Sequence, residues 1–214
     1  ITGATILPQA VFDVDAVLER IPRDQVSMLP GPPALYQSIL LRGTGEADLS
    51  SLRLAVTGAA SIPVQLIRDM RDVLGFETVI TGYGLTEATG IATMCRHDDD
   101  PETIATTSGR AIPGVEVRLV DAQGDEVPRG QPGHVTVKGY NVMRGYLERP
   151  EDTAQTIVDG WLRTGDVAVM GATQLGVAIP NFWFAMILVV IFAIKLRWFS
   201  AGGFAGWDEG LFLG

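Results

Sequence analysis

Cysteine and positive charge are scarce in this sequence of 214 residues. A single cysteine, Cys95, excludes an internal disulfide and fits a reducing compartment. Lys and Arg total 16 against 25 Asp and Glu, which gives a formal net charge of −9 and argues against nucleic-acid binding. The first residues also lack the pattern of a secretory signal peptide. We therefore expect a globular protein, cytoplasmic over residues 1–171, with no nucleic-acid partner.

The polar residues around Cys95 do not predict a metal or redox centre. We expect Cys95 to be a small buried side chain rather than a nucleophile. His97 precedes Asp98, Asp99 and Asp100. This run favours a solvated acidic loop that ends at Pro101 over a metal cluster.

The first half of the chain alternates predicted strands and helices. The strands are predicted at 26–29, 52–57 and 77–80, and the helices at 15–21, 34–41 and after Ser61, with Pro63 in the first turn. A strand–helix–strand order predicts parallel strands, whose carboxyl ends are where ligands bind. Two small-residue loops, 58–60 and 81–87, follow such strands. We therefore expect these loops to converge at one edge of an α/β sheet.

The second loop carries polar groups suited to a nucleotide. Tyr83 offers an aromatic face, Thr86 can donate to a phosphate oxygen, and Glu87 is a hard oxygen ligand for Mg²⁺. Glycines at 82, 84 and 90 would allow tight turns or a close ligand. From residues 81–90 alone, a purely structural loop explains the pattern equally well.

The second part of the chain is predicted to be richer in β-structure. Residues 115–120 and 135–137 read as strands of a small antiparallel segment joined by short hairpins. A helix is predicted from Pro150 to about Val158, and a glycine-flanked, exposed carboxylate, Asp166, closes the segment. We therefore divide this part of the sequence into domains at 1–108 and 109–171.

Five motifs in this order closely resemble the adenylate-forming superfamily over residues 1–171. That superfamily contains acyl-CoA synthetases, peptide-synthetase adenylation domains and firefly-type luciferases. The motifs are Gly58-Ala59-Ala60, Gly82-Tyr83-Gly84-Leu85-Thr86-Glu87, Gly109-Arg110, Met143-Arg144-Gly145-Tyr146 and Gly160-Trp161-Leu162-Arg163-Thr164-Gly165-Asp166. The residues after Glu87 resemble the CoA ligases of lipid and sterol-fragment breakdown more than luciferases.

The resemblance implies an AMP-forming ligase that uses ATP, Mg²⁺ and coenzyme A. A carboxylic acid would be activated as an acyl-adenylate and then transferred to the thiol of coenzyme A. Thr86 would contact the α-phosphate, Glu87 would hold Mg²⁺, Tyr83 would stack on adenine, and Asp166 would accept hydrogen bonds from the ribose. The implied nucleotide-binding set is Gly58, Ala59, Ala60, Thr81, Gly82, Tyr83, Gly84, Thr86 and Asp166.

Other motifs of the superfamily are not found in the sequence. These are a phosphate loop ending in Lys-Gly, the hinge after the Thr-Gly-Asp motif, and a mobile subdomain with a catalytic lysine. The two lysines do not replace the last of these, because Lys138 lies in a strand pattern and Lys195 borders an apolar segment. We therefore expect a ligase fragment that is inactive alone.

The composition of the sequence changes after Asp166. No charged residue occurs between Asp166 and Lys195, and 175–194 is long and apolar enough to predict a transmembrane helix, with Lys195 and Arg197 favouring a cytoplasmic end. A buried core helix is the alternative. Residues 172–214 resemble a permease of dipeptide and oligopeptide ABC importers, which implies a chimera and a possible inner-membrane location. The alternative functions are a membrane transport component carrying an adenylate-family piece, or an assembly artefact.

Overall fold

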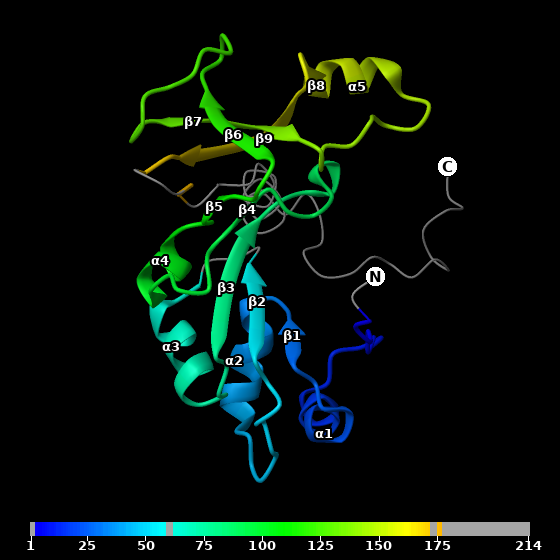
Figure 1. The fold of residues 1–214 in the computed structure, drawn as a ribbon, viewed down its shortest axis with the longest axis vertical. Coiled ribbons are helices and arrows are strands. Elements are labelled where there is room, and N and C mark those ends of the chain that lie inside the picture. The colour runs from blue at the N-terminus through cyan, green and yellow to red at the C-terminus, as the bar shows by residue number, and fades with distance from the viewer. Residues whose placement is uncertain (1–2, 59–61, 172–174, 177–214) are drawn as a thin grey trace, which may run out of the picture.

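Two β-sheets form the framework of the protein (Figure 1). The computed structural model describes residues 3–58, 62–171 and 175–176. The first sheet has the strand order β1-β2-β3-β4-β5 and the second has the order β6-β7-β9-β8. Helices α2 and α3 lie beside the first sheet, and α5 lies beside the second (Figure 1).

The first sheet contains the predicted parallel strand–helix–strand unit. β2 pairs in parallel with both β1 and β3, and its register with β3 runs from Leu54 opposite Thr78 to Gly58 opposite Gly82. β4 and β5 then extend the sheet in antiparallel fashion. The strands are β1 (Met28–Pro30), β2 (Leu54–Gly58), β3 (Thr78–Tyr83), β4 (Thr93–Met94) and β5 (Arg110–Ala111).

Apolar side chains from the flanking helices bury the first sheet. Ile39, Ile67 and Met70 are nearly inaccessible to solvent, and the fully buried Tyr36 donates its hydroxyl to the Leu29 carbonyl at 2.6 Å. The helices are α1 (Val14–Asp24), α2 (Pro33–Arg42), α3 (Val64–Asp72) and α4 (Pro101–Thr106). This core fixes the carboxyl ends of β2 and β3 side by side.

The second sheet is antiparallel throughout, as the sequence predicts. β6 begins and ends where the alternating pattern places it, at Val115 and Val120. The other strands of the second sheet are β7 (Pro132–Gly139), β8 (Ile157–Val158) and β9 (Trp161–Val169). Helix α5 spans Pro150–Thr156. The first sheet reaches Ala111 and the second starts at Val115, while the division into domains at residue 109 stays a prediction.

Several predicted boundaries differ from the structure. Pro30 belongs to β1 because this strand lies at the edge of its sheet, where a missing backbone N–H is tolerated. The helix predicted to reach Val158 ends at Thr156, since Ile157 and Val158 pair with β9. The predicted capping residue Ser61 lies outside the described residues, and α3 instead starts after Pro63.

Most of the predicted transmembrane helix lies outside the described residues. Only Leu175 and Gly176 of that segment are described, and they do not begin a helix. Leu175 is buried, and its backbone exchanges hydrogen bonds with Ser108 and Gly109 at 2.9 and 2.8 Å. Within residues 3–58, 62–171 and 175–176, no helix has the length and apolar character needed to cross a bilayer.

Candidate nucleotide site

The loop after β3 is shorter than predicted, because the strand continues through Tyr83. Thr81 and Gly82 are part of β3, and the Thr81 side chain is 5% exposed. Gly84 packs so tightly that an added Cβ would overlap the backbone of Gly90 and Ile91. The close contact predicted at Gly84 is therefore a contact with the backbone of Gly90 and Ile91, later in the same loop. Gly58 ends β2 beside Gly82, and Ala59 and Ala60 lie outside the described residues.

A short hydrogen bond joins the two sheets at this loop. The Tyr83 hydroxyl donates to Oδ2 of Asp166 at 2.6 Å, across 83 residues of sequence. Burial of the half-buried phenol, and then the hydrogen bond to Asp166, raise the pKa of Tyr83. The phenol therefore stays protonated near neutral pH and acts as a donor. The structure thus brings together two residues that the sequence analysis assigned to adenine and ribose.

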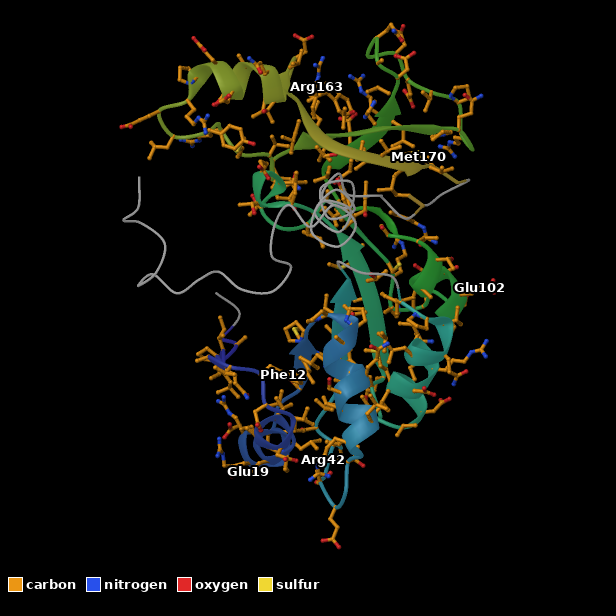
Figure 2. The ribbon with its side chains drawn as sticks, turned by 180° about the vertical axis from the view of Figure 1, so that it is seen from behind. Phe12, Glu19, Arg42, Glu102, Arg163 and Met170 are labelled. Atoms are coloured by element: carbon orange, nitrogen blue, oxygen red, sulfur yellow. The ribbon has the colours of Figure 1, made fainter. Side chains whose placement is uncertain are left out.

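Asp166 lies within β9 rather than at the end of an exposed loop. β9 pairs with β7 through His134 opposite Val167 and Thr136 opposite Arg163, and the register shifts between these pairs. Residues 164–166 therefore form a bulge, with Gly165 at φ 81°. Arg163 and Met170, labelled in Figure 2, lie on the two sides of this bulge. A bulge turns a side chain away from the regular alternation, which here directs Asp166 to Tyr83.

The predicted metal ligand Glu87 lies in a short 3-10 helix, η1 (Thr86–Ala88). Its Oε1 accepts a hydrogen bond from the Tyr146 hydroxyl at 2.9 Å, and its backbone carbonyl accepts one from Met143 N–H at 2.8 Å. The hydrogen bond to Glu87 raises the pKa of Tyr146. Thr86, beside Glu87, is an exposed residue.

Asn141 is a buried residue of this site that the sequence analysis missed. Its Nδ2 donates to the carbonyls of Ala88 and Ile91 at 3.2 and 2.7 Å. The backbone carbonyl of Asn141 accepts a hydrogen bond from Thr89 Oγ1 at 2.7 Å. Asn141 therefore holds the turn after Glu87 against the loop after β7. Its position just before the Met143–Tyr146 motif was the only signal in the sequence.

The donor set fits a magnesium ion that is held jointly with a nucleotide. No group of three His, Cys, Asp or Glu residues that could hold a metal ion is found among the described residues. Mg²⁺ keeps several waters and is commonly bound by one or two carboxylates plus substrate phosphates. Glu87 supplies one such carboxylate, and the exposed residue Thr86 lies next to it in the sequence.

The Cys95 side chain is buried, as predicted, but the acidic loop after it is not fully solvated, because the Asp99 side chain is only 9% exposed. Cys95 is buried beside Thr107, and burial raises the pKa of its thiol. Asp99 pairs with Arg110 at 3.2 Å. Asp100 caps α4, which begins at Pro101, so the acidic loop ends at the predicted residue.

Comparison with known proteins identifies the family. The family model described as AMP-binding enzyme matches residues 1–147. A 3-[(3aS,4S,7aS)-7a-methyl-1,5-dioxo-octahydro-1H-inden-4-yl]propanoyl:CoA ligase from Rhodococcus jostii is 51% identical over 172 residues, which cover 79% of this chain and 31% of the relative. A feruloyl-CoA synthase from Amycolatopsis is 38% identical over 174 residues, covering 78% of this chain and 34% of that protein.

Solved structures agree with the sequence relatives. An amide bond synthetase from Marinactinospora thermotolerans superposes with a TM-score of 0.69 at 36% identity, covering 77% of this chain and 34% of that chain. An anthranilate CoA ligase in complex with anthranoyl-AMP superposes with a TM-score of 0.68 at 30% identity. The match covers 76% of this chain and 31% of that chain.

The chain thus spans about a third of the length of these relatives. The relatives named here give no support to the predicted permease segment at 172–214 or to a chimera. The match of the family model to residues 1–147 shows that the chain belongs to the AMP-binding enzyme family.

Proposed function

We propose that this chain is the nucleotide-binding part of an AMP-forming acid–CoA ligase. The observation that carries the proposal is the hydrogen bond from Tyr83 to Asp166, which joins the glycine-rich loop of the first sheet to the bulge of the second. Glu87 lies four residues beyond Tyr83. One carboxylate suited to a ribose and one suited to a metal therefore belong to the same region.

Each side chain has a role that its chemistry supports. The Asp166 carboxylate would accept hydrogen bonds from a ribose diol, and the hydroxyl of the exposed residue Thr86 would donate to a phosphate oxygen. Glu87 would hold Mg²⁺ through one oxygen, and the bound ion would supply positive charge beside the phosphates. The carboxylate of the acid attacks the α-phosphorus of ATP and pyrophosphate leaves. The sulfur of coenzyme A then attacks the acyl carbon and AMP leaves.

The relatives suggest the class of acid. The two ligases that act on an indane-dione propanoate are 51% and 47% identical to this chain, whereas the feruloyl-CoA synthase is 38% identical. We therefore propose a substrate with a propanoate side chain on a saturated bicyclic ring. This agrees with the expected similarity to ligases of sterol-fragment breakdown.

A chimeric enzyme tests the proposal. Residues 1–171 replace the matching segment of the Rhodococcus jostii ligase, and CoA-dependent ligase activity with its own acid is measured. We expect activity to be retained, and Glu87→Ala in the chimera to lower kcat about a hundredfold or more, because a charge-stabilising contact at the transition state is lost.

Asp166→Ala in the same chimera serves as a contrast. The ribose does not change during the reaction, so this variant should raise the apparent KM for ATP more than it lowers kcat. A folded chimera without ligase activity would contradict the proposed function. Full kcat in the Glu87→Ala variant would contradict the metal assignment alone.

A further inference from the structure

Tyr146 belongs to a motif, Met143–Tyr146, to which the proposed mechanism gives no role. Its hydroxyl lies 2.9 Å from Oε1 of Glu87, 59 residues away in sequence. We propose that Tyr146 is a positioning residue, which orients the Glu87 carboxylate for the magnesium ion that accompanies a bound nucleotide. This inference rests on the proposed function and deepens it.

The loop that carries Tyr146 is tied to Glu87 on its N-terminal side. Met143 N–H donates to the carbonyl of Glu87 at 2.8 Å. Two residues earlier, the buried Asn141 bonds to the carbonyls of Ala88 and Ile91. These bonds are made by backbone or buried groups, so the loop after β7 and the turn around Glu87 form one connected unit.

The loop is also tied on its C-terminal side. The backbone N–H of Tyr146 donates to Thr153 Oγ1 at 2.9 Å. Thr153 lies in α5, and its hydroxyl donates in turn to the Arg149 carbonyl at 2.9 Å. Tyr146 is thus fixed between α5 and the turn at Glu87, so its hydroxyl position is set by the surrounding backbone.

The hydrogen bond leaves one oxygen of Glu87 available. Oε1 accepts from Tyr146, and among the described residues no hydrogen bond or ion pair to Oε2 is found. A carboxylate fixed through one oxygen loses less rotational freedom when the other binds a metal. Residues that hydrogen-bond to a metal ligand typically change metal affinity by about 10–100-fold when they are removed.

Equilibrium binding of ATP to the full 214-residue chain tests the role of Tyr146. Affinity is measured by calorimetry with Mg²⁺ and with a chelator in place of Mg²⁺. We expect Tyr146→Phe to reduce the gain in ATP affinity from Mg²⁺ by about tenfold and to leave metal-free affinity unchanged. Tyr140→Phe is the matched control, because Tyr140 is 77% exposed in the same loop and no hydrogen bond from its hydroxyl to a described residue is found.

A second variant shows whether Tyr146 acts through Glu87. Glu87→Gln should remove the gain from Mg²⁺, and adding Tyr146→Phe to it should cause no further loss, since contacting residues that act through one another are not additive. Circular dichroism and thermal unfolding confirm that each variant is folded.

The outcomes separate the inference from the proposed function. A wild-type chain that is folded but binds no ATP would contradict the proposed function, and the inference with it. If the wild-type chain binds ATP equally tightly with and without Mg²⁺, the metal role of Glu87 is contradicted. If Mg²⁺ increases the ATP affinity of Tyr146→Phe as much as or more than that of wild type, the positioning role alone is overturned. A larger increase in the variant would mean that the phenol competes with the metal.

Discussion

Two tyrosine hydroxyl groups each donate to one of the two carboxylates of the site. Tyr83 bonds to Asp166 at 2.6 Å and Tyr146 bonds to Glu87 at 2.9 Å. A phenol O–H donates and a carboxylate oxygen accepts, so both acidic side chains act as acceptors in these bonds. Among the described residues, no hydrogen bond to the second oxygen of either carboxylate is found.

The types of these residues could be predicted from the sequence, but their partners could not. The glycine-rich pattern marks Tyr83 and Glu87, and the Thr-Gly-Asp motif marks Asp166. Which tyrosine meets which carboxylate depends on contacts across 83 and 59 residues. Local patterns carry no information on such distant pairs, which is also why Asn141 was missed.

Gly109 offers a test at the scale of one residue. Its φ is +76°, and an added Cβ would overlap the backbone of Met94 and Cys95. Gly109→Ala should therefore lower the free energy of unfolding by about 2–5 kcal/mol, from backbone strain plus overpacking. The measurement is denaturant-induced unfolding followed by fluorescence.

Gly124→Ala is the control for this substitution. Gly124 has a similar φ of +94° but nothing within 4 Å of an added Cβ. Only the conformational cost remains, about 1–2 kcal/mol. Equal losses for the two alanine variants would show that close packing at Gly109 does not matter.

At the scale of helices and strands, the sequence predicts β6 well but misses β9 (Trp161–Val169), the longest described strand, and all of the two-residue strands. Strand β6 was predicted with its observed bounds because apolar and polar residues alternate in its sequence from Val115 to Leu119. Strands β4, β5 and β8 contain two residues each, too few to show a period. Their positions follow from pairing with neighbours, so they depend on the complete sheet.

The N-terminus of α4 gives a pH-dependent prediction. Asp100 Oδ1 accepts from the N–H groups of Glu102 and Thr103 at 2.9 and 3.0 Å. The bond from Thr103 is the largest cause of a lowered Asp100 pKa. A lowered folded-state pKa stabilises the fold above the unfolded pKa of about 3.9, and this contribution is lost as the pH falls through the folded pKa.

Asp100→Asn keeps the capping oxygen and removes the charge. We expect it to lower Tm by roughly 1–4 °C at pH 7, and the difference from wild type to shrink below about pH 4. Asp98→Asn, two residues earlier in the same loop and outside the cap, removes the same charge and should have a smaller effect. A difference that does not change between pH 7 and pH 3 would argue against the charged cap.

At the scale of the whole molecule, the chain spans about a third of the length of its relatives. Lys138 lies in β7 with its Nζ 5.6 Å from the centre of the Trp161 ring, and Lys195 lies outside the described residues. We expect the 214-residue chain by itself to catalyse no acid-dependent exchange of pyrophosphate into ATP above a control without enzyme.

The physical reason is missing stabilisation of the transition state. Loss of a single well-placed contact typically costs about 2.7–4 kcal/mol, and both a phosphate loop and a catalytic lysine are not found in the sequence. The Rhodococcus jostii ligase is the positive control for the assay. Exchange above background that depends on an added carboxylic acid would show that the chain is active alone.

The hydrogen bond from Tyr83 to Asp166 also sets an order of events during protein synthesis. The two residues are 83 positions apart, and at about 5–20 residues per second the ribosome adds Asp166 roughly 4–17 s after Tyr83. All strands of the first sheet have been made by Ala111. A growing polypeptide therefore contains every strand of the first sheet before it contains Asp166, so the bond from Tyr83 to Asp166 is among the last contacts of the described fold that can form.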